Sequence, residues 1–497
     1  MLTDWYDYKS HCEITGTSQS GKSKFAEWCM REHVIEGNGF CLLDWHGTLY
    51  QAVLDYLAYL PTGQPVYLLN PSDPQFITPF NPFRFRKGSV SAHVDRMSDT
   101  ILKPWGNDPN LMPTYERIVK MVLSLAAVSG EPIHHCAKLL EYPKKELREW
   151  AIAVIENDTV KQNWKQLQYL SLLRNGYERY LRQVESTQNR LARFVESDSV
   201  KLFTGLPGGI HIDDIVDKEA ILLVNLKPSY YLSAEAGRTF AALLLSEFLH
   251  SALNHTDEER PYFLYLDECQ NYLTTDAGQI LDQVLKTGLR LTLIHHHAGQ
   301  FHHNPALLDS LDMNAQIKVI FGGLTPTQAK MAAETLFFPE LNKRWKKDDK
   351  VHYVTDHYED SFETVTDTEG EFGSSHAVTS GSRLIPSVER IVDGQEDWTY
   401  EEKLSQLAER LTSLPRQHCY VKLPNGTLER EVPWVEPVLL DSDDMIRFMQ
   451  TLPNQIPLQD AERILKEQER AFLERSKSYE SRGARPKKRP PTLHEQG

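Results

Sequence analysis

The stretch GTSQSGKS at residues 16–23 decides the fold of this chain. It matches the pattern G-x-x-x-x-G-K-[ST], follows a short apolar lead-in and precedes KFAEWCMREHVI (24–35), which predicts a helix. Backbone N–H groups of such a loop converge on phosphate oxygens, and the dipole of the following helix adds to the attraction. We therefore predict a nucleotide-binding loop made of nine residues: Gly16, Thr17, Ser18, Gln19, Ser20, Gly21, Lys22, Ser23 and Lys24.

A second motif lies far along the chain, in PYFLYLDECQNYL at residues 261–273. Its apolar strand ends in Asp267-Glu268, which places one carboxylate to hold Mg²⁺ and the next to polarise an attacking water. Taken alone, the segment is equally well read as a strand that ends in a polar turn. Beside the phosphate loop it predicts an ATPase with ATP and Mg²⁺ as cofactors. Lys22 is then expected to contact the β and γ phosphates, and Ser23 to share the Mg²⁺ with Asp267.

The composition sets the class of protein. The chain has 497 residues, enough for about three domains. Its formal net charge of -15 argues against a protein that binds nucleic acid over its whole surface, but it is compatible with a local basic channel. The sequence contains no run of eighteen or more apolar residues, so it predicts no membrane span. The six cysteines lack a CxxC pair, and Asp4 and Asp7 stand where a secretory signal needs basic residues. We expect a cytoplasmic protein.

Short apolar runs alternate with helical patterns on both sides of a purely helical stretch. This rhythm predicts an α/β core with a parallel-rich sheet, an all-α insertion and a small C-terminal extension. The Asn-Gly at 425–426 predicts a tight hairpin in the extension. The expected boundaries are 1–110 and 206–344 for the two halves of the core, 111–205 for the helical insertion, 345–395 for a flexible linker, 396–440 for a small α+β element and 441–497 for a helical, basic and Pro-rich tail.

Several stretches resemble the FtsK/HerA superfamily of ring-forming DNA-pumping ATPases, most closely the coupling proteins of conjugation and type IV secretion. They are HCEITGTSQSGKSKF (11–25), LLDWHGTLY (42–50), NPFRF (81–85), LDECQNYL (266–273), GLRLTLIHHHAGQF (288–301) and NAQIKVIFGG (314–323). The resemblance runs with gaps from about His11 to Leu336, roughly two thirds of the chain. It implies a RecA-like P-loop NTPase core, a homo-oligomeric ring such as a hexamer, DNA as partner, and a relaxase, secretion channel or nuclease as further partner.

Two positions depart from the pattern of coupling proteins. Leu285-Lys286 stands where the family has an Arg-Lys pair whose arginine reaches the neighbouring subunit's nucleotide. The candidates left for that role are Lys286, Arg290, Arg238, Arg190 and Arg193. His296 stands where a glutamine commonly senses the γ phosphate, and since histidine donates hydrogen bonds we expect His296 to take the sensing role. The membrane segment of true coupling proteins is also missing from the sequence.

The histidines around His296 allow another interpretation. His295, His296, His297, His302 and His303 are metal-ligand residue types. Successive residues at a strand end point in different directions, however, which favours a phosphate-sensing or polar-loop role for His296. The role of Asp44, at the end of another apolar run, is left open.

Two functions fit these observations. The first is an ATP-dependent DNA translocase that hydrolyses ATP between the subunits of a ring, in conjugative DNA transfer or a related DNA-processing system. The second is a non-translocating NTPase scaffold whose nucleotide state assembles or gates a partner effector, as in anti-phage defence or secretion complexes. Both keep the phosphate loop and the Asp-Glu pair, so these motifs do not separate the two. The missing arginine favours the scaffold.

Overall fold

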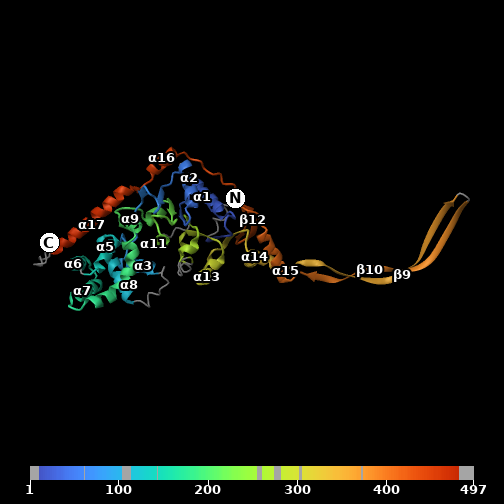
Figure 1. Cartoon of the computed structure of the whole chain (residues 1–497), viewed down its shortest axis with the longest axis horizontal. Coiled ribbons are helices and arrows are strands. Elements are labelled where there is room, and N and C mark those ends of the chain that lie inside the picture. Colours follow the sequence, from blue (N-terminus) through green and yellow to red (C-terminus); the bar gives the residue numbers. More distant parts are fainter. Residues whose placement is uncertain are drawn as a thin grey trace, which may run out of the picture. The chain divides into compact units, whose positions relative to one another are not determined.

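The computed structural model describes residues 10–60, 62–102, 113–142, 144–254, 260–273, 281, 283–301, 305–370 and 373–480. These residues form two compact units. Unit 1 comprises the chain up to Gly323 and from Pro415 onward, and unit 2 comprises Leu324–Leu414. Figure 1 shows the course of the chain.

A nine-stranded sheet organises unit 1, in the order β12-β11-β8-β1-β7-β6-β2-β5-β3. The strands from β8 to β3 run parallel, and β11 pairs antiparallel with both β8 and β12. The bounds are β1 Cys12–Thr15, β2 Phe40–Asp44, β3 Val66–Leu69, β5 Ile221–Asn225, β6 Tyr262–Leu266, β7 Leu289–His295, β8 Ile317–Phe321, β11 His418–Leu423 and β12 Gly426–Glu431. The predicted α/β class with a parallel-rich sheet is confirmed.

Helices cover both faces of the sheet. Alternate residues of each strand point to opposite faces and pack in two separate cores. In β2, Phe40 and Leu42 belong to one apolar core with α1 (Lys22–Glu36) and α2 (Thr48–Tyr59). Cys41 and Leu43 belong to the second core, with α3 (Val90–Leu102), α10 (Ile212–Asp217), α11 (Ala234–Asn254) and α13 (Pro305–Asn314). Burial on both faces explains why β2, β3 and β5 are almost entirely apolar.

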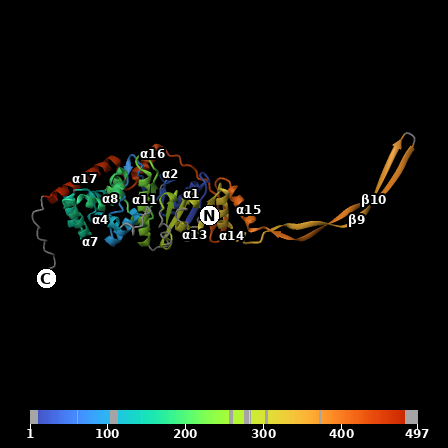
Figure 2. The same cartoon turned by 60° about the horizontal axis from the view of Figure 1, so that its bottom comes forward.

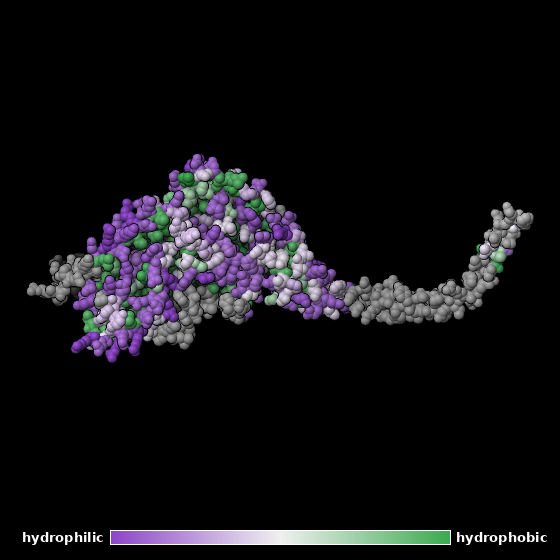
Figure 3. Space-filling view, viewed as in Figure 1, coloured by the Kyte–Doolittle hydropathy of each residue, from purple (hydrophilic) through white to green (hydrophobic). Residues whose placement is uncertain are grey.

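The helical insertion stands between α3 and α10. It consists of α4 Pro113–Ser129, α5 Ile133–Ala137, α6 Lys145–Val154, α7 Asp158–Leu172, α8 Tyr177–Val195 and α9 Asp198–Gly205. Its interior holds the fully buried Arg148, which donates hydrogen bonds to Leu139 O, the Tyr180 hydroxyl and Ser171 Oγ, each at 3.0 Å. Hydrophilic residues predominate on the face of the insertion that Figure 3 shows. The buried apolar residues of the insertion belong to the same core as one face of the sheet.

The C-terminal segment of unit 1 returns across the molecule. Its helix α16 (Ser442–Thr451) packs on α2, the short β13 (Ile456–Pro457) pairs with β4 (Phe76–Ile77), and α17 (Leu458–Glu480) packs on α6 and α9. Figure 2 shows α17 lying along the helical insertion. Phe472 of α17 stacks on His135, with ring centroids 4.6 Å apart. This segment ties the sheet to the insertion. No helix among the described residues is both long and apolar enough to cross a membrane.

Unit 2 differs from what the sequence led us to expect. It pairs α14 (Pro326–Leu341) with α15 (Tyr400–Thr412), and between them β9 (Lys346–Gly370) and β10 (Gly373–Asp397) form one long antiparallel hairpin. We expected a flexible linker at 345–395. The element expected at 396–440 is also divided, since α15 belongs to unit 2 whereas β11 and β12 extend the sheet of unit 1.

Candidate nucleotide-binding site

The predicted phosphate loop lies between β1 and α1, at the edge of the sheet where the parallel strands end. Its backbone is fastened to the two neighbouring strands. Gly16 N donates to His296 O at 3.1 Å, just past the end of β7, and Thr17 Oγ1 donates to Gly322 O at 3.3 Å, just past β8. Ligands of open parallel sheets bind at this edge. The loop therefore stands in the place where the fold binds ligands.

Two glycines of the loop are required by close packing. A Cβ on Gly16, which has φ 152°, would lie 2.5 Å from Phe321 Cβ. A Cβ on Gly21, with φ 122°, would lie 3.0 Å from the ring of Phe321 and 3.2 Å from Gln417 Cα. Gln417 also donates its backbone N–H to Ser20 O at 2.9 Å. The loop thus packs against the end of β8 and against the residues that lead into β11.

The side chains of the other predicted loop residues lie mostly at the surface. The side chains of Ser18, Gln19 and Ser23 are exposed at the loop and at the first turn of α1. Lys24 is also exposed, but its Nζ pairs with Glu27 at 2.8 Å instead of facing the loop. Only the backbone of Lys24 remains available for an anion at the start of the helix.

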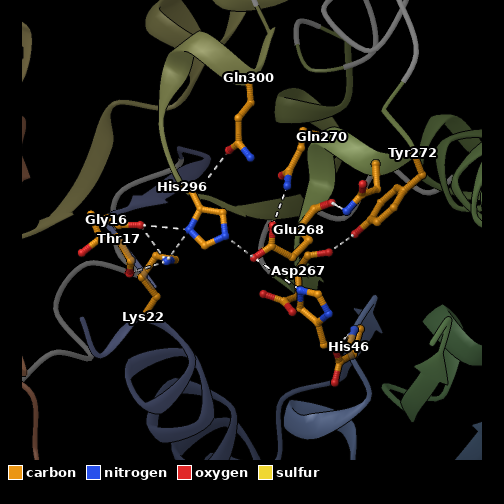
Figure 4. A network of polar contacts seen from close by, with 12 residues as sticks. Gly16, Thr17, Lys22, His46, Asp267, Glu268, Gln270, Tyr272, His296 and Gln300 are labelled. Carbon is orange, nitrogen blue, oxygen red and sulfur yellow. Dashed lines mark hydrogen bonds and ion pairs between the residues drawn. The ribbon is translucent and has the colours of Figure 1, made fainter. Parts of the chain in front are cut away.

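The Lys22 side chain is turned back onto its own loop. Its Nζ donates to Gly16 O at 2.7 Å and to Thr17 O at 3.0 Å, and lies 3.3 Å from His296 Nδ1 (Figure 4). Burial lowers the pKa of Lys22, and the charges of Glu268 and Asp267 oppose this effect. Two backbone carbonyls of the loop therefore hold the Lys22 ammonium beside the positions where phosphate is expected.

Asp267 follows β6 and faces a second buried carboxylate, Asp44, which ends the adjacent β2. Burial raises the pKa of Asp267 well above its usual range, as do the nearby charges of Asp44 and Glu268 and a hydrogen bond with Asp44. Asp44 also accepts hydrogen bonds from His46 N at 2.8 Å and from Tyr50 N at 2.7 Å. A carboxyl pair that is costly to ionise fully is suited to a divalent cation, so these residues fit Mg²⁺.

Glu268 is buried and has a left-handed backbone, with φ 48° and ψ 46°. This conformation is strained for a residue other than glycine, and such strain concentrates at functional sites. Its Oε1 lies 3.0 Å from His296 Nε2 and 3.9 Å from His46 Nε2, while Oε2 accepts from Gln270 Nε2 at 2.5 Å (Figure 4). The predicted general base is therefore held by donors on both oxygens.

His296 connects the two halves of the site. Its Nδ1 lies 3.3 Å from Lys22 Nζ and 3.4 Å from Gly16 O, and its Nε2 lies 3.0 Å from Glu268 Oε1. Gln300 Oε1 accepts from His296 N at 2.8 Å and fixes the backbone that carries the ring. His296 thus bridges the lysine of the loop and the predicted base, as Figure 4 shows.

Three residues at the site were not singled out from the sequence: His46, Gln270 and Gln300. The first two follow the ends of adjacent parallel strands, and this shared position is the signal that could have indicated them. His295 Nε2 turns to Glu13 Oε1 at 2.9 Å, and His302 and His303 lie outside the described residues. In the described part of the chain, no group of three or more His, Cys, Asp or Glu is arranged to hold a metal ion.

The candidates for a charge donated to a neighbouring subunit are dispersed. Arg290 is buried in β7, and Lys286 is exposed just before that strand. Arg238 of α11 donates Nε to Asn271 O at 3.1 Å, next to the Asp-Glu turn. In the insertion, Arg193 donates to Thr239 Oγ1 at 2.7 Å and Arg190 lies 4.6 Å from the Tyr115 ring centroid. Of the five, Arg238 is both exposed and attached to the predicted catalytic turn.

Comparison with solved structures identifies the fold. The bacterial conjugative coupling protein TrwB in an unbound form matches with a TM-score of 0.51 and 14% identity, over 87% of this chain and 88% of that chain. TrwB in complex with ADP and Mg²⁺ matches with a TM-score of 0.51 and 14% identity, over 89% of both chains. A weaker likeness, with a TM-score of 0.46 and 12% identity over 86% of this chain and 89% of that one, is to VirB4 of Thermoanaerobacter pseudethanolicus. No protein-family model and no curated protein matches the sequence. The RecA-like fold that the resemblance to coupling proteins implied is confirmed.

Proposed function

We propose that this chain is an ATPase of the secretion and conjugation type, and that it works as a DNA translocase in a ring, such as a hexamer. The observation that carries the proposal is the bridge of Lys22, His296 and Glu268. It joins the phosphate loop to a buried carboxylate across the edge of the sheet at which ligands bind. A TrwB structure of the same fold holds ADP and Mg²⁺. The ring, the DNA and the conjugative role extend this likeness by analogy.

Each residue has a defined task in the proposed reaction. The backbone N–H groups of the loop and Lys22 bind the phosphates of ATP, and Lys22 exchanges the carbonyls of Gly16 and Thr17 for phosphate oxygens. Mg²⁺, held by Ser23 and Asp267, would neutralise charge on the phosphates. When Lys22 leaves Nδ1 of His296, the ring is free to reorient toward the terminal phosphate. Glu268 then takes a proton from the attacking water.

Glu268→Gln tests the assignment of the base. We expect this variant to bind ADP with the parental Kd and to release phosphate from ATP at least about 100-fold more slowly. Glu462→Gln, the same change at an exposed position of α17, is the matched control and should keep the parental rate. Turnover of Glu268→Gln at the parental rate would refute the assignment.

The response of ATP hydrolysis to DNA tests whether the chain is a translocase. A translocase should hydrolyse ATP faster on single- or double-stranded DNA, displace a protein bound to the DNA track, and form rings with ATP and DNA. Hydrolysis that ignores DNA, with nothing displaced, excludes the motor. Monomers in the presence of ATP and DNA would contradict the ring.

The second candidate, an NTPase scaffold that assembles or gates a partner effector, is favoured by one observation. Leu285 stands where coupling proteins carry the arginine that completes the neighbouring site, and Arg290, five residues on, is buried. Slow, DNA-independent hydrolysis together with nucleotide-dependent capture of a partner would select this function. Arg238→Ala should lower turnover if Arg238 supplies the missing charge and leave it unchanged if the chain does without one.

A further inference from the structure

The segment NPFRFRK at residues 81–87 leads toward α3 and alternates aromatic with basic residues. Phe83 is buried and Phe85 is half-buried, and both pack into the apolar core on this side of the sheet. The two phenylalanines therefore anchor the segment, and Arg84 and Arg86, which alternate with them, are exposed. We call residues 81–87 the basic turn.

The basic turn forms a groove with the first turns of α3, the start of α10 and the last turns of α11. Its backbone is fixed to α3, because Phe83 O lies 3.2 Å from His93 Nε2. Arg96, one turn further along α3, places Nη2 3.2 Å from His93 Nδ1 and pairs through Nη1 with Glu247 of α11. The walls of the groove are thus held to one another by polar contacts.

The groove is small and lies apart from the phosphate loop. Its volume is about 50 Å³, whereas pockets for whole small-molecule ligands measure about 300–1,000 Å³. It therefore has room for a group such as a single phosphate and not for a whole nucleotide. His250 of α11 lines the groove, and Arg238 of the same helix contacts the turn after Asp267-Glu268. The twelve residues from Arg238 to His250 correspond to about 18 Å of helix.

Positive charge predominates in the groove. Among the described residues that line it, the cations are Arg84, Arg86, Lys87 and Arg96, and the anions are Asp213 and Glu247. Burial and the charge of Arg96 lower the pKa of His93 to about 4 and also lower the pKa of His250. Burial and the charge of Arg86 lower the pKa of His211. At all three histidines the neighbouring charge with the largest effect belongs to an arginine, which indicates a positive field that attracts anions.

The two outermost cations of the basic turn have loosely held partners. Arg86 Nη1 lies 3.6 Å from Asp214 Oδ2, and Lys87 Nζ lies 3.7 Å from Asp213 Oδ2. Charge-assisted hydrogen bonds are about 2.7–2.9 Å long, so neither pair is hydrogen-bonded. Exposed ion pairs of this kind contribute little to stability. A phosphate, which a guanidinium binds through two parallel hydrogen bonds, can displace these carboxylates.

We propose that the groove and the basic turn bind the sugar-phosphate backbone of DNA, with one phosphate in the groove and its neighbours on the exposed cations of the turn. The choice of DNA rests on the proposed translocase function. The size of the groove favours one phosphate of a long chain over a free nucleotide, and exposed arginines on a fixed turn suit the phosphates on either side. Because such contacts do not read base edges, binding should be independent of sequence and should weaken with salt.

The test measures binding of a fluorescently labelled oligonucleotide of mixed sequence, as single strand and as duplex, to the full chain without ATP. The groove variant carries Arg84→Gln, Arg86→Gln and Lys87→Gln. At about 0.1 M salt its Kd for the oligonucleotide should be at least about tenfold that of the parental chain, and the slope of log Kd against log salt should fall by about two to three. Its Kd for ADP should be unchanged, because the groove lies apart from the phosphate loop, and this also shows that the variant is folded.

Two further variants separate a site from general attraction. The control variant carries Lys165→Gln, Arg179→Gln and Arg182→Gln, three exposed cations of the insertion, and has the same net charge as the groove variant. It should keep the parental Kd for the oligonucleotide. The third variant, Asp213→Asn with Asp214→Asn, removes the carboxylates that compete with phosphate and should bind the oligonucleotide about threefold more tightly.

Equal losses of oligonucleotide binding in the groove and control variants, or a third variant that binds no more tightly than the parental chain, overturn the site. A polyglutamate peptide that binds the parental chain as tightly as the oligonucleotide, and that the groove variant no longer binds, overturns DNA as the occupant. If the chain binds the oligonucleotide through the groove but neither binds nor hydrolyses ATP, the proposed function fails and the site stands. If it hydrolyses ATP and binds no oligonucleotide, the site is overturned and the ATPase stands.

Discussion

Replacing Glu13 with glutamine tests the buried network behind the phosphate loop. Glu13, in the centre of β1, accepts from His295 Nε2 at 2.9 Å on one oxygen and from Lys318 Nζ at 2.6 Å on the other. Burial by itself raises the pKa of Glu13, but the hydrogen bond from His295 and the charge of Lys318 outweigh it and lower the pKa from 4.5 to about 2. The network therefore favours the folded state only while Glu13 is ionised.

The size and sign of the effect follow from this pKa. Between pH 4.5 and 2 the unfolded chain binds a proton at Glu13 that the folded chain does not, so this stabilisation is complete above about pH 5 and is lost as the pH falls toward 2. A pKa lowered from 4.5 to about 2 corresponds to about 3 kcal/mol. Breaking a buried ion pair has a cost of the same order, about 3–5 kcal/mol.

The measurement is urea denaturation of the parental chain and of Glu13→Gln at several pH values, with Glu462→Gln as control. The parental chain should be more stable than Glu13→Gln by about 3 kcal/mol at pH 6, and the two should approach each other as the pH nears 2. The control should follow the parental chain throughout. A difference between the parental chain and Glu13→Gln that stays constant over this range would refute the role of ionised Glu13.

Three further changes test the site. Asp267→Asn should raise the thermal midpoint of the Mg²⁺-free chain, and more at pH 8 than at pH 5, because the raised pKa of Asp267 means that its contribution to stability is lost as the pH rises above 3.8; an unchanged midpoint contradicts this. Gly16→Ala should lose ADP binding in a titration and about 1–3 kcal/mol of stability, since its Cβ would lie 2.5 Å from Phe321 Cβ. Gln270→Ala removes the donor to Glu268 Oε2 and should lower kcat about tenfold with the ADP Kd unchanged; a change in Kd alone would argue against it.

The sequence was sufficient where a local pattern has one structural meaning. The phosphate loop needs glycine at positions 16 and 21. In a chain that has such a loop, an apolar strand that ends in Asp267-Glu268 predicts the carboxylates of an NTPase site. Both motifs directly follow parallel strands, β1 and β6. The predicted strand pair near Asn425 also forms, with the turn one residue earlier, at Pro424-Asn425.

The sequence was insufficient where the outcome depends on contacts between distant residues. Nothing local in residues 418–431 reveals that β11 pairs with β8, or that Gln417 reaches Ser20. In 345–395, the acidic and Ser/Gly-rich composition predicted a linker and outweighed the β-branched residues of segments such as ETVTDT (363–368). For His46 and Gln270, the sequence contains the residue types but not the distance to Glu268.

The contacts of Lys22, Glu268 and the Asp44–Asp267 pair also indicate how a nucleotide would enter the site. Lys22 is satisfied by carbonyls of its own loop and Glu268 by His296 and Gln270, so each proposed catalytic group has a neutral substitute partner. In the pair of Asp44 and Asp267, the backbone N–H groups of His46 and Tyr50 donate to Asp44, but burial and the charges of Asp44 and Glu268 still raise the pKa of Asp267. A divalent cation relieves that repulsion, and a phosphate is a stronger acceptor for Lys22 than a carbonyl. Binding of a Mg²⁺–nucleotide would therefore exchange partners around a single bridging histidine, whose backbone carbonyl accepts the N–H of Gly16 in the phosphate loop.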